Sequence, residues 1–186
     1  MIGPMRPGNL RRTAIFAPIL LVLLAHTGCL RQYDEPALIA FSRNLGPPYQ
    51  EEIFVMDADG SSERRLTISP ERMYRPSWSP DGSKIAYNED TLPTGRVFTM
   101  DADGGSKRYL CEGSSPTWSP DGRRLVLSRN GDLIVINAGN GGGEFALTVG
   151  MGDTHPSWSP DGKRIAFLRE IAPQWHICTV NSSDGG

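Results

Sequence analysis

Oxygen-bearing side chains gather in one segment whose spacing suits metal binding. Asp57-Ala58-Asp59-Gly60-Ser61 places oxygen ligands at alternate positions, an arrangement that a hard cation such as Ca²⁺ prefers. An EF-hand loop also requires a bidentate glutamate at its twelfth position, and Ile68 stands there in this chain. We therefore interpret the segment as a hairpin turn, and we predict no metal site and no cofactor.

Histidine and cysteine, which serve most often in acid–base and nucleophilic catalysis, are scarce. After residue 29 the histidines are His155 and His176, and the cysteines are Cys111 and Cys178. No G-x-S-x-G, H-E-x-x-H or C-x-x-C motif occurs. We expect no enzyme activity, two free and partly buried thiols, and a surface position for His155. Trp175, which we place at a polar loop end, is interpreted as either an exposed contact residue or an edge-packing residue.

The elements that would position any site repeat with a period of 40 residues. Trp78, Trp118 and Trp158 each begin the sequence W-S-P-D-G, and a proline precedes each tryptophan by two positions. We interpret the repeated residues as structural, because tryptophan packs between sheets, proline fixes φ and Asp-Gly forms a tight turn. They are Pro76, Trp78, Pro80, Asp81, Gly82, Pro116, Trp118, Pro120, Asp121, Gly122, Pro156, Trp158, Pro160, Asp161 and Gly162.

Short strands follow each copy of this motif. The first set comprises Lys84–Tyr87, Arg124–Leu127 and Arg164–Phe167, and Leu38–Phe41 fits the same pattern. Two further strands complete each unit of about 40 residues, so each unit is predicted to be a small antiparallel sheet. Such a sheet cannot bury both faces alone and must stack on its neighbours. The predicted fold is all-β, with about four blades of a β-propeller. Lys84, Arg124 and Arg164 are expected to be solvated or paired with aspartate.

The N-terminus is predicted to be an export signal. Arg6, Arg11 and Arg12 precede an apolar stretch from Thr13 to Ala25, which has the length of a signal-peptide core. Gly28-Cys29 resembles the end of a bacterial lipobox, which implies lipidation of Cys29; an ordinary cleaved signal and an uncleaved anchor are the alternatives. The remaining chain has 16 basic and 21 acidic residues, which gives no basic surface for nucleic acid.

The repeat resembles the WD-like propeller repeat of the TolB family. That family's blades carry P-x-W-S-P-D-G, then a strand, an I-x-V-M-D-x-D-G turn and an R-L-T strand, as in Ile53–Gly60 and Arg65–Thr67 here. The expected organisation is a signal at 1–29, a linker at 30–36 and TolB-like propeller repeats at 37–186. TolB itself resembles a six-bladed propeller preceded by an α/β domain. Nothing of that domain's length separates Cys29 from Leu38.

The resemblance implies a function in binding proteins. We expect a non-catalytic interaction module of the bacterial cell envelope, in the periplasm or at the outer membrane, anchored through lipid on Cys29 and bound to an envelope protein partner. The alternatives are a propeller that binds carbohydrate or peptidoglycan fragments, and the propeller part of a peptidase-like enzyme without its hydrolase domain.

Closure of the ring presents a difficulty at this length. The first unit lacks its tryptophan strand, and the fourth reaches Gly186 before its last strand. We favour a truncated gene product or an incomplete, open propeller, with pairing to another copy or subunit and an unusually small propeller as alternatives. Open sheet edges would also permit self-association.

Overall fold

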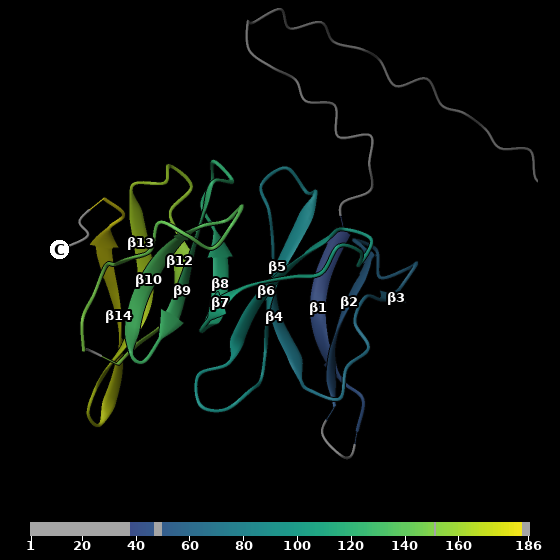
Figure 1. Ribbon diagram of the computed structural model, residues 1–186, viewed down its shortest axis with the longest axis horizontal. Helices are drawn as coiled ribbons and strands as arrows, with labels where there is room; N and C mark the ends of the chain where they lie inside the picture. The colour runs from purple at the N-terminus through teal and green to yellow at the C-terminus, as the bar shows by residue number, and fades with distance from the viewer. Residues whose placement is uncertain (1–37, 47–49, 151, 184–186) are drawn as a thin grey trace, which may run out of the picture. The chain divides into compact units, whose positions relative to one another are not determined.

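The computed structural model describes residues 38–46, 50–150 and 152–183. All regular secondary structure in these ranges consists of β-strands (Figure 1). The strands form four antiparallel sheets, so the all-β fold with four sheet repeats is confirmed. Within these ranges no helix has the length and apolar character needed to cross a membrane.

The four sheets follow one another along the chain, and strands that are consecutive in sequence are neighbours in each sheet. The first sheet contains β1 (Leu38–Asn44), β2 (Glu51–Asp57) and β3 (Arg64–Arg65). The second contains β4 (Met73–Trp78), β5 (Lys84–Glu89), β6 (Arg96–Asp101) and β7 (Arg108–Glu112). The third contains β8 (Ser114–Trp118), β9 (Arg124–Arg129), β10 (Asp132–Asn137) and β11 (Phe145–Ala146). The fourth contains β12 (Asp153–Trp158), β13 (Arg164–Ile171) and β14 (Gln174–Asn181).

The repeated proline before each tryptophan lies in the edge strand that begins its sheet. Pro76, Pro116 and Pro156 are in β4, β8 and β12. Proline has no N–H for a ladder and is therefore tolerated in a sheet only at an edge or a bulge. Both conditions hold, because the pairing register of each of these strands shifts around its proline.

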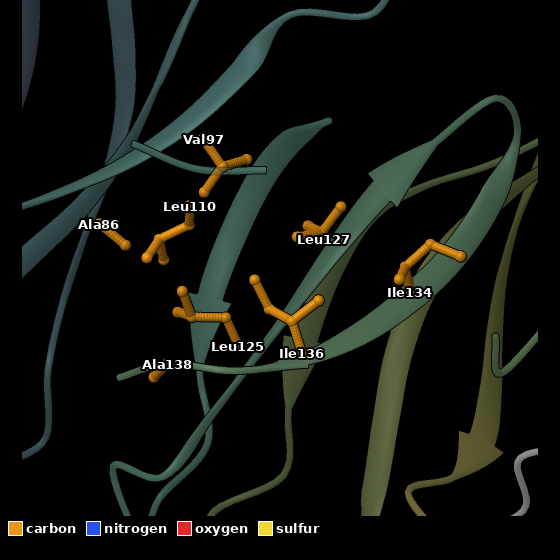
Figure 2. Close-up of a cluster of buried hydrophobic side chains, with 8 residues drawn as sticks. All are labelled: Ala86, Val97, Leu110, Leu125, Leu127, Ile134, Ile136 and Ala138. Atoms are coloured by element: carbon orange, nitrogen blue, oxygen red, sulfur yellow. The ribbon is translucent and has the colours of Figure 1, made fainter. Parts of the chain in front are cut away.

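Three apolar clusters hold adjacent sheets together. Ala86 and Val97 of the second sheet meet Leu125, Leu127 and Ile136 of the third (Figure 2). A similar cluster joins the first and second sheets, and another joins the third and fourth. The second and third sheets therefore bury both faces, which explains why their central strands are apolar at nearly every position.

The outer sheets have fewer strands. Within the described residues, the first sheet has no strand that corresponds to β4, and the fourth has none that corresponds to β7. The arrangement agrees with the expectation of an incomplete propeller, since the two inner sheets have four strands each and the two outer sheets three.

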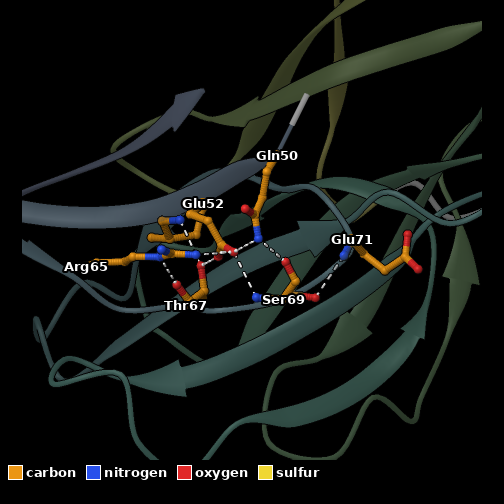
Figure 3. Close-up of polar contacts among 7 residues, drawn as sticks. Gln50, Glu52, Arg65, Thr67, Ser69 and Glu71 are labelled. Carbon is orange, nitrogen blue, oxygen red and sulfur yellow. Dashed lines mark hydrogen bonds and ion pairs between the residues drawn. The ribbon is translucent and has the colours of Figure 1, made fainter. Parts of the chain in front are cut away.

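One charged group is buried in the first sheet. The Glu52 side chain is fully buried, and its carboxylate accepts hydrogen bonds from the Thr67 hydroxyl, the Ser69 backbone N–H at 2.8 Å and the Arg65 guanidinium at 2.8 Å (Figure 3). These contacts hold the segment after β3 against β2. They matter because β3, the outer strand of this sheet, has only two residues and adds little pairing of its own.

Candidate functional site

Each W-S-P-D-G segment forms a turn that satisfies its own polar groups. In the first copy the Ser79 hydroxyl donates to Asp81 Oδ1 at 2.6 Å and accepts from the Lys84 N–H at 2.9 Å. The Asp81 carboxylate also accepts from the Ser83 N–H at 3.1 Å. The copies at Ser119–Arg124 and Ser159–Arg164 repeat these bonds. That these residues are structural, and do not bind a ligand, stays a prediction.

The same turns give the protein a defined acid response. Hydrogen bonds from the neighbouring serine hydroxyl, and then from a backbone N–H, lower the pKa of Asp81, Asp121 and Asp161 below the ordinary value near 4. Because the folded-state pKa is depressed, the carboxylates stabilise the fold above about pH 4, and this contribution is lost as the pH falls through their folded values. Urea unfolding at a series of pH values should therefore show a decline below about pH 4. In Asp121→Asn that decline should be shallower, and an unchanged slope would contradict the assignment.

The repeat tryptophans join consecutive sheets through their indole N–H groups. Trp118 Nε1 donates to the Ser77 carbonyl at 3.1 Å, and Trp158 Nε1 donates to the Thr117 carbonyl at 3.3 Å. Each bond connects the first strand of a sheet to the first strand of the sheet before it, so β4, β8 and β12 lie next to one another. Trp78 Nε1 is buried and has no hydrogen-bond partner among the described residues.

This difference predicts unequal effects of one substitution in the two tryptophans. Phenylalanine keeps most of the aromatic packing and removes only the indole donor. Trp118→Phe should lower the free energy of unfolding by about 1 kcal/mol more than Trp78→Phe, because only Trp118 loses a hydrogen bond. Urea denaturation of both variants measures the difference, and equal losses would show that the indole bond adds nothing.

The candidate site is a row of three residues that share an unusual backbone conformation where the first strands converge. Arg75, Ser115 and His155 precede the repeat prolines, and their φ angles are 56°, 55° and 54°. Positive φ is rare for residues other than glycine and is often retained at functional sites. Each residue lies where the strand register shifts, and such bulges re-aim side chains. We call these residues the bulge row.

The side chains of the bulge row act on one another. The Arg75 guanidinium donates a hydrogen bond to the Ser115 hydroxyl and lies 5.4 Å from the centre of the Tyr74 ring. Partial desolvation of the ring, and then the positive charge of Arg75, lower the pKa of His155 below its ordinary value of 6.5, which favours the neutral imidazole at pH 7. Arg75 and His155 are exposed and Ser115 is buried. The row thus offers one fixed positive charge and one neutral imidazole to a ligand.

A separate hollow of about 380 Å³ lies between two of the W-S-P-D-G turns. Asp121 and Asp161 line it, and the Arg124 guanidinium lies 5.0 Å from the centre of the Trp158 ring. Arg124 is half-exposed, and besides covering an aromatic face it adds, through its charge, to the hydrogen bonds that lower the pKa of Asp121. Lys84 pairs with Asp101 at 2.6 Å, as expected. The hollow contains no histidine or cysteine that could act as a base or nucleophile.

The remaining residues considered in the sequence analysis are the cysteines and the Asp57–Ser61 segment. Cys29 lies outside the described residues, and Asp57–Ser61 forms a turn in which Ser61 donates to Asp59. Cys111 and Cys178 are free and partly buried, as predicted, and burial raises the pKa of Cys111 to about 11.

The structure corrects the position of Trp175 and adds contacts along the bulge row that the sequence did not indicate. The placement of Trp175 in a loop was wrong, because it lies within β14 opposite Glu170 and is exposed. Sequence reasoning also missed that Arg75 bonds Ser115 and acts electrostatically on His155. The available signal was that all three residues occupy the variable position before the repeat proline.

Comparisons with known proteins give the same fold. The family model described as the TolB beta propeller domain matches residues 37–186. "Tol-Pal system protein TolB" of Sodalis glossinidius (strain morsitans) is 43% identical over 51 residues, which are 27% of this chain and 11% of that protein. A solved TolB structure from Agrobacterium tumefaciens matches with a TM-score of 0.68 and 26% identity, over 81% of this chain and 59% of that one.

A more distant structure extends the likeness of fold. An oligogalacturonate lyase in complex with manganese matches with a TM-score of 0.51 and 22% identity, over 69% of this chain and 40% of the lyase. This likeness shows the fold alone. The alignments span about a tenth of the curated relative and about three fifths of the solved TolB chain. The family model, by contrast, covers most of the present chain, which therefore belongs to the TolB β-propeller family.

Proposed function

We propose that this chain is a non-catalytic protein-binding module of the bacterial cell envelope and that the bulge row is its contact site. Membership of the TolB β-propeller family supports the proposal, as does the naming of a curated relative as a protein of the Tol-Pal system. The observation that carries it is the positive φ at Arg75, Ser115 and His155, three different side chains at the same position of the repeat.

The chemistry of the bulge row fits a peptide segment with an acidic group. A guanidinium offers several N–H donors to a carboxylate or to backbone carbonyls, and Arg75 is already oriented by Ser115 and Tyr74. His155 can donate or accept a hydrogen bond, because its imidazole is neutral. The partner is therefore expected to bind through a carboxylate near backbone carbonyls.

Crosslinking in the native cell envelope tests this contact. The tagged full-length chain should capture a specific protein, and Arg75→Ala and His155→Ala should each reduce the recovery of that protein at least about tenfold, as expected for hot-spot residues. Arg123→Ala, which removes an exposed arginine from a W-S-P-D-G turn, is the matched control and should leave recovery unchanged. Equal recovery with all three variants would refute the proposed site.

Export and anchoring are part of the same proposal. Residues 1–29 would direct the chain out of the cytoplasm, and lipid on Cys29 would hold it at a membrane in the periplasm or at the outer membrane. Cys29→Ala should abolish incorporation of labelled fatty acid and move the protein to the soluble periplasmic fraction. Detection of the unlabelled wild-type protein in that soluble fraction would contradict the anchor.

Two finer points complete the proposal. The absence of catalysis would be overturned by a hydrolase activity that a single substitution in this chain abolishes. Self-association through unpaired sheets is proposed as well, because the first and fourth sheets each have a neighbouring sheet on only one side within the described residues.

A further inference from the structure

One position that is buried in the first three sheets is exposed in the fourth. Strand pairing places Ile53, Val97, Leu133 and Ile177 at the same position of β2, β6, β10 and β14. The first three are 0% exposed because each faces the next sheet in the series. Ile177 is 82% exposed. The fourth sheet thus presents to solvent the face that the other three sheets bury.

The other end of the series shows the reciprocal pattern. The equivalent residues on the opposite face are Ile39, Ile85, Leu125 and Ile165, which occupy the same position of β1, β5, β9 and β13. The last three are 0% exposed because each faces the preceding sheet, whereas Ile39 is 40% exposed. The first sheet thus presents the face that the other three sheets bury.

Both free faces continue the apolar pattern of the internal contacts. Side chains alternate along a strand, so Leu168 and Trp175 share the face of Ile177, and Phe41 shares the face of Ile39. The Arg43 guanidinium lies 5.2 Å from the centre of the Phe41 ring, so a solvated cation partly covers a face that a sheet covers elsewhere. Trp175 is 56% exposed, a large aromatic area for a free surface.

We propose that the Trp175–Ile177 face of one copy docks on the Ile39–Phe41 face of a second copy. This inference rests on the self-association proposed above and identifies its surface. We choose a second copy of the chain as the binding partner because the same two kinds of face already pack against each other inside the molecule. At each contact between adjacent sheets, the face equivalent to Trp175–Ile177 packs against the face equivalent to Ile39–Phe41. The contact is heterologous, and two such contacts close a pair of copies into a symmetric dimer.

Two lysine substitutions at equally exposed isoleucines test the surface. Ile177→Lys places a charge on the docking face, whereas Ile68→Lys places one in the loop after β3, where the isoleucine is 81% exposed. In sedimentation of the full chain at about 1–100 μM, the wild type and Ile68→Lys should form dimers. Ile177→Lys should weaken dimerisation at least about tenfold, as for a central interface residue. Thermal melts of the variants at low concentration check that each remains folded.

A mixing experiment tests the head-to-tail arrangement. Ile39→Lys should weaken dimerisation to a similar extent. An equimolar mixture of Ile39→Lys with Ile177→Lys should form more dimer than either variant alone, because one intact pair of faces remains between the two variants. A wild-type monomer at the highest concentration would overturn both self-association and the docking face. Dimers that resist Ile177→Lys, or a mixture that forms no more dimer than either variant alone, would overturn the docking face and leave self-association through another surface.

Discussion

Glu52→Ala should lower the free energy of unfolding by about 3 kcal/mol, the lower end of the range for breaking a buried ion pair. The carboxylate is fully buried and accepts bonds from Arg65, Thr67 and the Ser69 N–H (Figure 3). Alanine leaves these donors without their acceptor and opens the space that the side chain fills. Arg65 is partly solvated and recovers some of its hydration, which limits the loss.

The neighbouring glutamate is the matched control for this prediction. Glu51 pairs with Arg72 at 2.9 Å near the surface, where an ion pair contributes about 1 kcal/mol or less. Urea unfolding followed by tryptophan fluorescence should therefore show a much larger shift for Glu52→Ala than for Glu51→Ala. Equal shifts would mean that the buried network does not hold the segment after β3.

Leu127→Ala should cost a similar amount, about 3 kcal/mol, through loss of buried apolar area and the cavity left behind. Leu127 is fully buried among Val97, Leu125 and Ile136, between the second and third sheets (Figure 2). Units of this kind are stabilised by their contacts with neighbouring units. The substitution should therefore lower the midpoint of thermal unfolding for all of the described sheets together.

Leu92→Ala removes the same atoms from a side chain that is 96% exposed. Its effect on the free energy of unfolding should stay within about 0.5 kcal/mol. Calorimetry of the two variants would show how much of the loss comes from burial of the leucine side chain. A comparable loss for Leu92→Ala would show that the contact between the second and third sheets is not the source of the effect.

Much of the fold could be predicted because the repeat constrains its residues in a visible way. The constant W-S-P-D-G turn and the apolar strands that follow it predicted four antiparallel sheets, which the structure confirms. Trp175 was misplaced because no repeat copy supplies an aromatic residue there, and the pairing of β14 with β13 extends farther than in the other units. Pairing of a strand depends on its neighbour, which a local pattern does not report.

The candidate site was harder to predict from the sequence. Arg75, Ser115 and His155 hold the same position of the repeat but differ in chemistry, so their spacing alone does not indicate that their side chains interact. Their association arises from the convergence of β4, β8 and β12 and from a shared backbone angle, both of which are properties of the folded chain. Likewise, the sequence around Glu51 and Glu52 does not indicate which of the two side chains is buried. Glu52 is buried because the segment after β3 covers it, with Thr67 and the Ser69 N–H bonded to its carboxylate, and this contact exists only in the folded chain.

At the position before each repeat proline, the backbone conformation is the same in every copy although the side chain differs. Other residues supply the turn and the indole bond, whereas arginine, serine and histidine all occupy this position of the bulge with nearly the same φ. The side chain at this position can therefore differ between blades while the architecture of each blade is preserved. For protein engineers, the same position is a natural place to randomise when a propeller of this kind is to be retargeted.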